Sequence, residues 1–406
     1  MSAMTPVDDV VEALLARAIP LARAERLDLA EALGKILAED IVASIDVPAA
    51  DNSAMDGYAL DVTDPAMHVG GLYRVGDRIA AGYTGRPLTP GTLTRIFTGA
   101  PIPAGANTVL IQENTRRVGD LVEILEMPTQ ADNVRPRGQD IDLGQTVLSM
   151  GRRLQPQDLG LIASVGVARV AVYEPLVVGL MSTGDELVEP SGAIGPGQIY
   201  NSNHYTLSGL IRRLGMTVID LGLVADNADA TQRALLRGAE EADCIISSGG
   251  VSVGEEDYVK AAVEELGGLD FWRIAIKPGK PLAFGNVAGV PFFGLPGNPV
   301  SALVTFHQLA LLALIKLQNA EPINRTALKV RTTTELRKSP GRMDFQRGVL
   351  SLNEQGDNIV TSTGSQGSGI LSSLATANCY IILPAKQGKV SAGELVTVEI
   401  FDDYIR

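Results

Sequence analysis

Residues 243–267 read DCIISSGGVSVGEEDYVKAAVEELG, and this stretch decides the fold. Its apolar start is typical of a buried strand, and Ser-Ser-Gly-Gly then turns the chain toward a helix near Tyr258. A glycine turn between a strand and a helix is typical of a phosphate-binding loop, because free backbone N–H groups and the helix N-terminus attract an anion. This loop contains no lysine, however, and it ends in the carboxylates of Glu255, Glu256 and Asp257.

The same succession of strand, polar loop and helix extends on both sides, from Tyr173 to Leu317. Because strands and helices alternate along the chain, this order predicts a doubly wound α/β domain. The other predicted strands, with the loops that follow them, are LVVGLMSTGDEL (176–187), TVIDLGLVAD (217–226), FWRIAIKPG (271–279) and VPFFGLPGN (290–298). The predicted helices cover 203–215, 228–242, 257–267 and 299–317.

The segments around this region predict three further domains. Short apolar runs between glycine and proline turns predict a β-rich module inserted at 46–143, and alternating patterns predict a second β domain at 326–406. The segments 1–45 and 144–172 are assigned to a linker domain, which leaves 173–325 for the α/β domain.

Two helices are expected in the N-terminal segment. Apolar residues recur at helical spacing from Val7 to Ala18, which predicts one buried helical face. Asp28 and Glu31 have the spacing of a capping box, so a second helix is expected to start there and to present Leu33 and Leu37.

Composition excludes several classes of protein. The chain of 406 residues carries a net charge of −13, which argues against a nucleic-acid surface because phosphate neutralisation needs clustered Lys and Arg. Two distant cysteines and three scattered histidines predict no disulfide framework and no transition-metal site, so any metal should have oxygen ligands, as Mg²⁺ and Ca²⁺ do. No run of about 18 uncharged apolar residues occurs, and 303–317 is interpreted as a buried helix. The N-terminus has no secretory signal, and a cytoplasmic location is expected.

Polar and charged residues follow every predicted strand of the α/β domain. Ligands in such sheets bind beyond the carboxyl ends of the strands, so these loops should meet in one site. Carboxylates repel phosphate directly, and a Mg²⁺ ion shared between them and a phosphorylated ligand would reconcile the two. The charged residues brought to this edge are Asp185, Glu186, Asp226, Glu255, Glu256, Asp257, Lys277 and Lys280.

Several motifs together resemble the MoeA family, the molybdopterin molybdenumtransferases, which includes the E domain of gephyrin. The motifs are DNSAMDGYA (51–59), FTGAPIPAGAN (97–107), STGDEL (182–187), IYNSN (199–203), SSGGVSVGEEDYVK (247–260), KPGKPLAFG (277–285), GLPGNPVSA (294–302), GRMDFQRGVL (341–350) and TGSQGSGILSSL (363–374). The resemblance covers essentially the whole chain. It implies a multidomain α/β plus β fold: a central domain similar to MogA- and MoaB-type proteins, an inserted β-rich domain, an elongated linker domain and a C-terminal β-barrel.

The resemblance also implies an activity. Such proteins insert molybdate into the dithiolene of adenylylated molybdopterin, with Mg²⁺-dependent pyrophosphate cleavage and release of AMP. The family works as a homodimer with the active site at the protomer interface, and other proteins of molybdenum-cofactor biosynthesis are candidate partners. No nucleic acid or membrane is implied as a partner.

Site residues follow from the matched motifs. The resemblance implies catalytic roles for Glu186, Asp226, Asp257, Lys277 and Lys280, of which the three acids would hold the metal. It also implies substrate contacts for Asp56, Thr98, Arg347 and Ser368. For Asp56 a turn into a strand, and for Thr98 the cap of a bend, remain alternative interpretations. The strand-end loops are expected to hold the phosphate end of the pterin through Ser248, Gly249, Gly250, Ser252, Pro296, Gly297 and Asn298.

Two other functions stay open on the sequence alone. One is adenylylation of molybdopterin by ATP on the same α/β scaffold, and the other is a scaffold role like that of gephyrin. The sequence does not distinguish Mg²⁺ from Mn²⁺. It does not distinguish molybdate from tungstate either, because these two oxyanions are nearly alike in size and charge.

Overall fold

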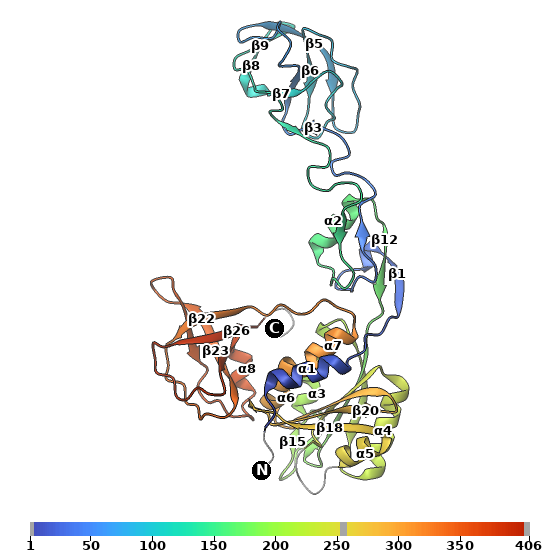
Figure 1. Cartoon of the computed structure of the whole chain (residues 1–406), viewed down its shortest axis with the longest axis vertical. Coiled ribbons are helices and arrows are strands. Elements are labelled where there is room, and N and C mark those ends of the chain that lie inside the picture. The colour runs from blue at the N-terminus through green and yellow to red at the C-terminus, as the bar shows by residue number, and fades with distance from the viewer. Residues whose placement is uncertain (1–3, 252–257, 402–406) are drawn as a thin grey trace. The chain divides into compact units, whose positions relative to one another are not determined.

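The structure, a computed structural model, describes residues 4–251 and 258–401 (Figure 1). The chain forms two compact units. The first comprises Met1–Glu25, Gly34–Ile36 and Tyr173–Arg406, and the second comprises Arg26–Leu33 and Leu37–Val172. The predicted fold class is confirmed, since the first unit holds a doubly wound α/β domain with a C-terminal β-barrel and the second is rich in β-strands. The boundaries of the four predicted domains stay predictions.

A six-stranded sheet organises the α/β domain. Its strands, in spatial order, are β16 (Thr217–Val224), β13 (Val177–Thr183), β17 (Cys244–Ser248), β21 (Val290–Leu295), β20 (Pro281–Val287) and β18 (Gly267–Arg273). The first four strands are mutually parallel, which is why the stretch around Cys244 is apolar throughout: both faces of a central parallel strand are covered. Two short parallel strands, β14 (Leu187–Val188) and β15 (Ile199–Tyr200), lie outside this sheet.

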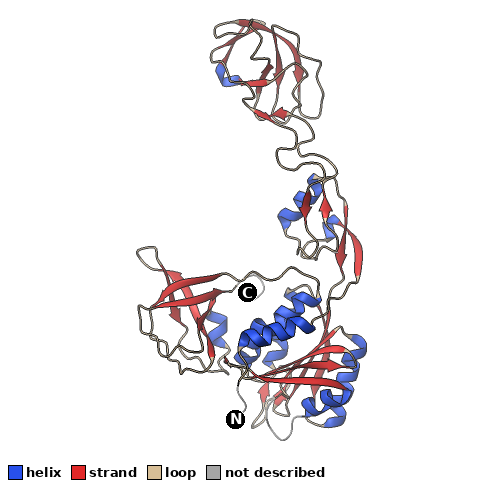
Figure 2. Cartoon of the chain, in the orientation of Figure 1, coloured by secondary structure: helices blue, strands red, loops and turns tan. Residues whose placement is uncertain are grey.

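Helices cover both faces of this sheet (Figure 2). One face packs against α1 (Val7–Arg17), α3 (Ser202–Arg213), α6 (Pro299–Thr305) and α7 (Leu311–Leu317), and the other against α4 (Ala228–Glu241) and α5 (Tyr258–Leu266). The helix predicted from Val7 is therefore confirmed, and it buries Val7, Val10 and Leu14.

Strand direction brings an additional loop to the functional edge of the sheet. Strand β20 is antiparallel to its neighbours β21 and β18, so it starts where the parallel strands end. The segment KPGKP, which leads into β20 at Pro281, consequently lies at the carboxyl edge together with the exits of the parallel strands.

The C-terminal part of the first unit is a closed barrel of five strands. Strand β23 (Met343–Leu352) pairs with both β24 (Asn358–Ser362) and β25 (Cys379–Leu383), and the ring is completed by β22 (Ala327–Thr332) and β26 (Leu395–Ile400). The short helix α8 (Ser372–Thr376) precedes β25. A two-residue strand of the α/β chain, β19 (Ile276–Lys277), joins the barrel sheet alongside β23.

The segment Pro299–Leu317 is the last helical element of the α/β domain. Among the described residues it is the one helix long and apolar enough to cross a membrane, yet 89% of it is buried inside the fold. The interpretation of 303–317 as a buried helix is thus confirmed. Between α6 and α7 the helix widens into a π-turn at Phe306–Ala310.

A buried polar network joins this π-turn to the barrel. The ring Nδ1 of His307 lies 2.7 Å from the hydroxyl of Tyr380, and the side chain of Gln308 donates a 2.8 Å hydrogen bond to Glu399. Arg325 donates to Gln308 and to the backbone carbonyl of His307, and its guanidinium lies 3.6 Å from Glu399. Burial, together with the positive charge of Arg325, lowers the pKa of His307 to about 3.

This network predicts a pH dependence of stability. In the unfolded chain His307 takes up a proton below about pH 6.5, whereas the buried ring stays neutral down to about pH 3. The stabilisation is complete above pH 6.5 and is lost as the pH falls toward 3, with a slope of up to about 1.4 kcal/mol per pH unit. Urea denaturation of the wild type and of His307→Phe, followed by circular dichroism at several pH values, should show this slope in the difference between the two unfolding free energies. A difference that is constant across this pH window would contradict the assignment.

The second unit contains another six-stranded sheet. Its strands, in spatial order, are β7 (Thr108–Ile111), β4 (Gly57–Leu60), β6 (Thr92–Ile96), β5 (Leu72–Ile79), β9 (Leu121–Ile124) and β8 (Thr115–Val118). The remaining elements are the pairs β3 (Asn52–Ser53) with β10 (Val134–Arg135), β2 (Ile41–Val42) with β11 (Thr146–Leu148) and β1 (Ala24–Asp28) with β12 (Arg169–Tyr173), the helix α2 (Pro156–Ser164) and the 3₁₀ turn Gln112–Asn114.

The helix predicted to start at Asp28 is wrong. Strand β1 ends at this residue, and only a single 3₁₀ turn, Leu29–Glu31, follows it. The Asp28 carboxylate makes no cap and instead lies 3.1 Å from the Arg169 guanidinium. Gly34, with a φ of +75°, has a left-handed conformation that ends a helix.

Candidate active site

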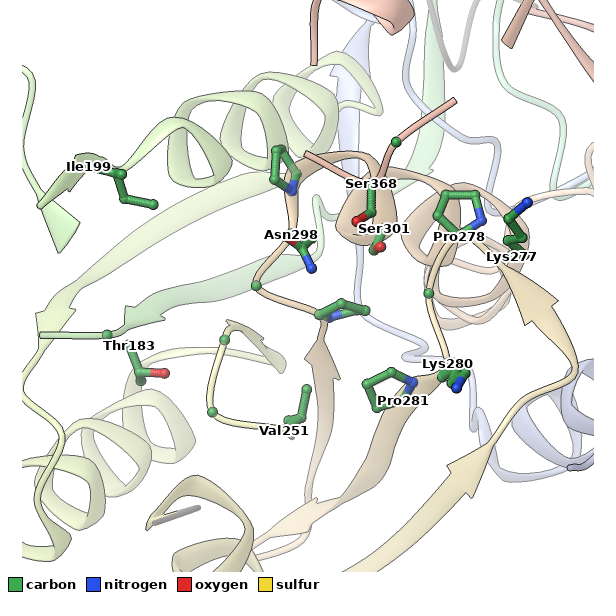
Figure 3. Close-up of a pocket in the computed structure, with 18 of the residues that line it drawn as sticks. Thr183, Ile199, Val251, Lys277, Pro278, Lys280, Pro281, Asn298, Ser301 and Ser368 are labelled. Carbon is green, nitrogen blue, oxygen red and sulfur yellow. The ribbon is translucent and has the colours of Figure 1, made fainter. Parts of the chain in front are cut away.

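A cavity of about 1170 Å³ opens at the carboxyl edge of the α/β sheet (Figure 3). The exits of β13, β17 and β21 form one part of its wall, the KPGKP segment forms another, and two segments of the barrel complete it. Of the predicted site residues, those that line the cavity are Glu186, Asp226, Gly249, Gly250, Lys277, Lys280, Pro296, Gly297, Asn298 and Ser368.

The loop after β17 requires glycine. Gly249 and Gly250 have φ angles of +97° and +66°, which side-chain-bearing residues rarely adopt. A β-carbon at Gly249 would also lie 2.6 Å from the carbonyl oxygen of Thr183. The backbones of neighbouring strand exits therefore approach closely, and the Thr183 hydroxyl is buried between them with no hydrogen-bond partner among the described residues.

The side chain of Asn203 links the loops that follow β17 and β21. Its side-chain amide, at the start of α3, donates 2.8 Å hydrogen bonds to the Ser248 hydroxyl and to the carbonyl of Gly297. Ser248 is buried and does not line the cavity. Ser248 accepts a hydrogen bond from the Asn203 amide, whereas Gly249, Gly250 and Gly297 form the cavity surface.

Two of the three predicted metal ligands are described. Glu186 and Asp226 are exposed carboxylates on the cavity wall, at the exits of β13 and β16. Asp257 and Ser252 lie outside the described residues. Within 4–251 and 258–401 no three side chains of His, Cys, Asp or Glu gather closely enough to hold a metal ion. The donors present are oxygen atoms, which fit the ligand preference of Mg²⁺.

Three cationic side chains line the same cavity. Lys277 and Lys280 come from the KPGKP segment, and Arg342 comes from the barrel just before β23. The Lys277 ammonium lies 3.0 Å from the carboxylate of Asp344, and Arg342 Nη1 is 3.5 Å from the carbonyl of Ile276. The cavity thus combines flexible point charges with a guanidinium that can bind an oxyanion through two N–H groups.

Arg347 lies beneath the cavity wall. It is completely buried, and it donates hydrogen bonds of 2.9 Å to the Ser373 hydroxyl and 3.1 Å to the carbonyl of Gly367. Gln366 in turn accepts a 2.8 Å hydrogen bond from the backbone N–H of Arg347. Arg347 therefore shapes the loop that presents Ser368, and Arg342 is the arginine that reaches the cavity surface.

Asp56 and Thr98 belong to the second unit, where they bind each other. Both the backbone N–H and the hydroxyl of Thr98 donate 2.9 Å hydrogen bonds to one oxygen of Asp56. These hydrogen bonds, with a smaller contribution from Arg95, lower the pKa of Asp56. The carboxylate thus holds the bend after β6, and the contact links the two motifs that contain these residues.

Sequence reasoning did not single out several residues of the site. Each lies inside a motif of the resemblance, so the motif located the loop but not the side chain that matters. The residues are Thr183, Asn203, Ser301, Asp344 and Gln366.

The chain matches known proteins over nearly its full length. Its residues 5–166 match the model of the MoeA N-terminal region (domains I and II), 179–316 match that of a probable molybdopterin-binding domain, and 329–401 match that of the MoeA C-terminal region (domain IV). A molybdopterin molybdenumtransferase of Haemophilus influenzae is 45% identical over 384 residues, covering 93% of this chain and 94% of the relative. Another from Nostoc is 36% identical, covering 92% and 88%. The crystal structure of a molybdopterin biosynthesis MoeA protein from Pyrococcus horikoshii superposes with a TM-score of 0.83 at 29% identity, covering 98% of this chain and all of that one.

Proposed function

Because the chain belongs to the MoeA family of molybdopterin molybdenumtransferases, which act in molybdenum cofactor biosynthesis, we propose that it inserts molybdate into adenylylated molybdopterin and releases AMP. One observation carries this proposal. Glycine loops, exposed carboxylates and three cations line a single cavity at the carboxyl edge of the sheet. A phosphorylated substrate and a second oxyanion can be bound side by side in such a cavity.

The glycine loops are proposed to bind the phosphate end of the pterin. Gly249 and Gly250 follow β17, and Gly297 with Asn298 follows β21. Because glycine lacks a β-carbon, the backbone at Gly250 and Gly297 can approach a phosphate oxygen closely, whereas the N–H of Gly249 donates to the carbonyl of Leu295 and holds the loop in place. The Asn203 amide binds Ser248 and the Gly297 carbonyl and so keeps the two loops together.

The cations are proposed to bind molybdate. Lys277, Lys280 and Arg342 converge with Ser368 on the barrel side of the cavity. Fixed positive charges in a partly enclosed site also stabilise negative charge that develops during transfer, which is the largest contribution to catalysis in many enzymes.

Glu186 and Asp226, together with Asp257, are proposed to hold a Mg²⁺ ion. When bound, such an ion supplies Lewis-acid chemistry that stabilises charge on the pyrophosphate. Held by these carboxylates, the metal would supply one counter-charge and the three cations of the cavity another, so that each anionic group of the substrates would have its own. A metal ion of this kind would let the carboxylates that follow the glycine turn lie beside a phosphate-binding loop.

The proposal includes a cytoplasmic homodimer with the active site at the protomer interface. Asp56 and Thr98 are then proposed to contribute to substrate binding. Their mutual hydrogen bonds support this role, because they hold the two side chains side by side, with both bonds on one oxygen of the Asp56 carboxylate. Other proteins of the same biosynthetic route are candidate partners.

An AMP-release assay tests the proposed function. Purified protein is given adenylylated molybdopterin with Mg²⁺, and molybdate, tungstate or neither. We expect AMP release to depend on an oxyanion and to fall about 10²-fold or more after EDTA treatment, since a Lewis acid contributes several kcal/mol of charge stabilisation. An equal rate of AMP release with molybdate, with tungstate and with neither would contradict the proposed transferase activity.

The same preparation separates the transferase from an adenylyltransferase. Molybdopterin and ATP replace the adenylylated substrate, and pyrophosphate is measured. We expect none above the control without protein. Rapid pyrophosphate release, without AMP release in the first assay, would instead support adenylylation.

A further inference from the structure

Lys277 lies where the α/β chain joins the barrel sheet. In the parallel pair of β19 and β23 its backbone stands directly opposite Asp344. The Lys277 ammonium lies 3.0 Å from the Asp344 carboxylate, whose side chain is only 2% exposed. Gln346 donates a 3.1 Å hydrogen bond to the same carboxylate oxygen and another to the carbonyl of Arg337, so the carboxylate is held within the barrel.

Lys277 borders two cavities. One is the candidate active site, and the other, of about 520 Å³, is lined by Lys277 and by Glu335, Arg337, Lys338, Ser339 and Lys389 of the barrel. A lysine side chain is long and flexible, and Glu335, the carboxylate of the second cavity, is paired at 2.7 Å with Lys389. The ion pair with the buried Asp344 carboxylate fixes the Lys277 ammonium at the boundary of the two cavities.

Other cations surround the same carboxylate. Burial lowers the pKa of Lys338, and the positive charges of Lys277 and Arg342 lower it further, while Asp344 opposes the shift. Lys338 donates hydrogen bonds to the carbonyls of Ser339, Ala385 and Gln387. The negative charge of Asp344 therefore offsets the mutual repulsion of three cations, Lys277, Lys338 and Arg342.

We propose that Asp344 is a positioning residue that holds the Lys277 ammonium at the wall of the active site for oxyanion binding. This inference rests on the proposed function of Lys277. A residue of this kind acts through another, so its loss should affect the molybdate step without altering the binding of adenylylated molybdopterin.

The test compares Asp344→Asn with two further variants. We expect Asp344→Asn to lower kcat/KM for molybdate about 10²-fold, mainly through KM, because a displacement of about 1 Å costs that much. The KM for adenylylated molybdopterin should stay unchanged. Asp344→Glu, which keeps the charge, should restore most of the loss. Glu399→Gln is the matched control, since Glu399 is a buried barrel carboxylate paired with Arg325 and does not line the cavity. It is expected to affect unfolding and not the KM for molybdate.

A double-mutant cycle separates positioning from a general structural effect. In a Lys277→Met background, Asp344→Asn should change kcat/KM for molybdate by less than about twofold, because the residue on which it acts is gone. A loss as large as in the wild-type background would overturn the proposal, as would an unchanged KM for molybdate in folded Asp344→Asn. Should that variant not fold, Gln346→Leu, which removes the amide that holds Asp344, takes its place with the same direction of change.

A measurement without turnover keeps the inference distinct from the proposed function. Lys277 is labelled with acetic anhydride at fixed pH, and the modified peptide is quantified by mass spectrometry. We expect several-fold faster labelling of Lys277 in Asp344→Asn than in the wild type or in Glu399→Gln. If labelling changes while the wild type releases no AMP, the positioning stands and the transferase activity fails. Equal labelling in all three proteins overturns the positioning.

Discussion

Replacing Gly249 with alanine is expected to lower AMP release at least about 10²-fold, even when substrate is saturating. The added β-carbon would lie 2.6 Å from the Thr183 carbonyl oxygen and 3.0 Å from its hydroxyl, so the loop must move away from the exit of β13. A backbone atom cannot swing aside as a flexible side chain can. In the proposed site, the displaced loop would no longer hold the phosphate end of the pterin.

Gly289→Ala is the matched control for this variant. Gly289 has a similar φ of +88°, but open space surrounds the position of its missing β-carbon, and it lies in the turn between β20 and β21. Both variants should lose about 1–3 kcal/mol of stability through backbone strain. Only Gly249→Ala should lose activity, and an equal effect of both on AMP release would show that the close approach to Thr183 is irrelevant.

Lys280→Met is expected to lower kcat/KM for molybdate by about 10²–10³-fold, the usual cost of removing one charge-stabilising group. Methionine keeps the length and the apolar stem of lysine but lacks the ammonium. Lys280 lines the cavity at the start of β20 (Figure 3), so the loss concerns an oxyanion at the wall and not the fold.

The matched control for Lys280 is Lys329→Met. Lys329 is an exposed lysine on β22 of the barrel that does not line the cavity. Molybdate kinetics and thermal unfolding of both variants decide the matter. If Lys280→Met retains the wild-type KM and kcat for molybdate, its proposed role is wrong.

Much of the fold could be predicted because its signals are local. The apolar run at Cys244, the glycine turn and the helix that follows all lie within 25 consecutive residues, 243–267. Closure of the barrel could not be predicted from the sequence, because it depends on the long-range pairing of β23 with β25. The wrongly predicted helix at Asp28 has a similar cause, because the chain up to this residue forms strand β1, which pairs with the distant strand β12.

The candidate site also has features that could be predicted from the sequence and features that could not. Glycine loops at strand ends were predictable because their chemistry is local, and Gly249, Gly250 and Gly297 do line the cavity. Burial is a property of the whole fold, so the sequence could not distinguish Arg342 on the cavity surface from Arg347 beneath it. The pairing of Lys277 with Asp344 spans 67 residues and depends on the register of β19 against β23.

The two-residue strand β19 bears on the proposed binding of the oxyanion. Since β19 is hydrogen-bonded into the barrel sheet, the repulsion among neighbouring cations is overcome when the chain folds and not when substrate arrives. If these cations bind the oxyanion as proposed, the electrostatic field at the cavity wall is preorganised, and little reorganisation energy remains for the transfer step. Clustered cations lower the free energy of unfolding, and bound anions offset this loss. A chloride-rich or phosphate-rich buffer should therefore raise the melting temperature of the first unit while it competes with molybdate.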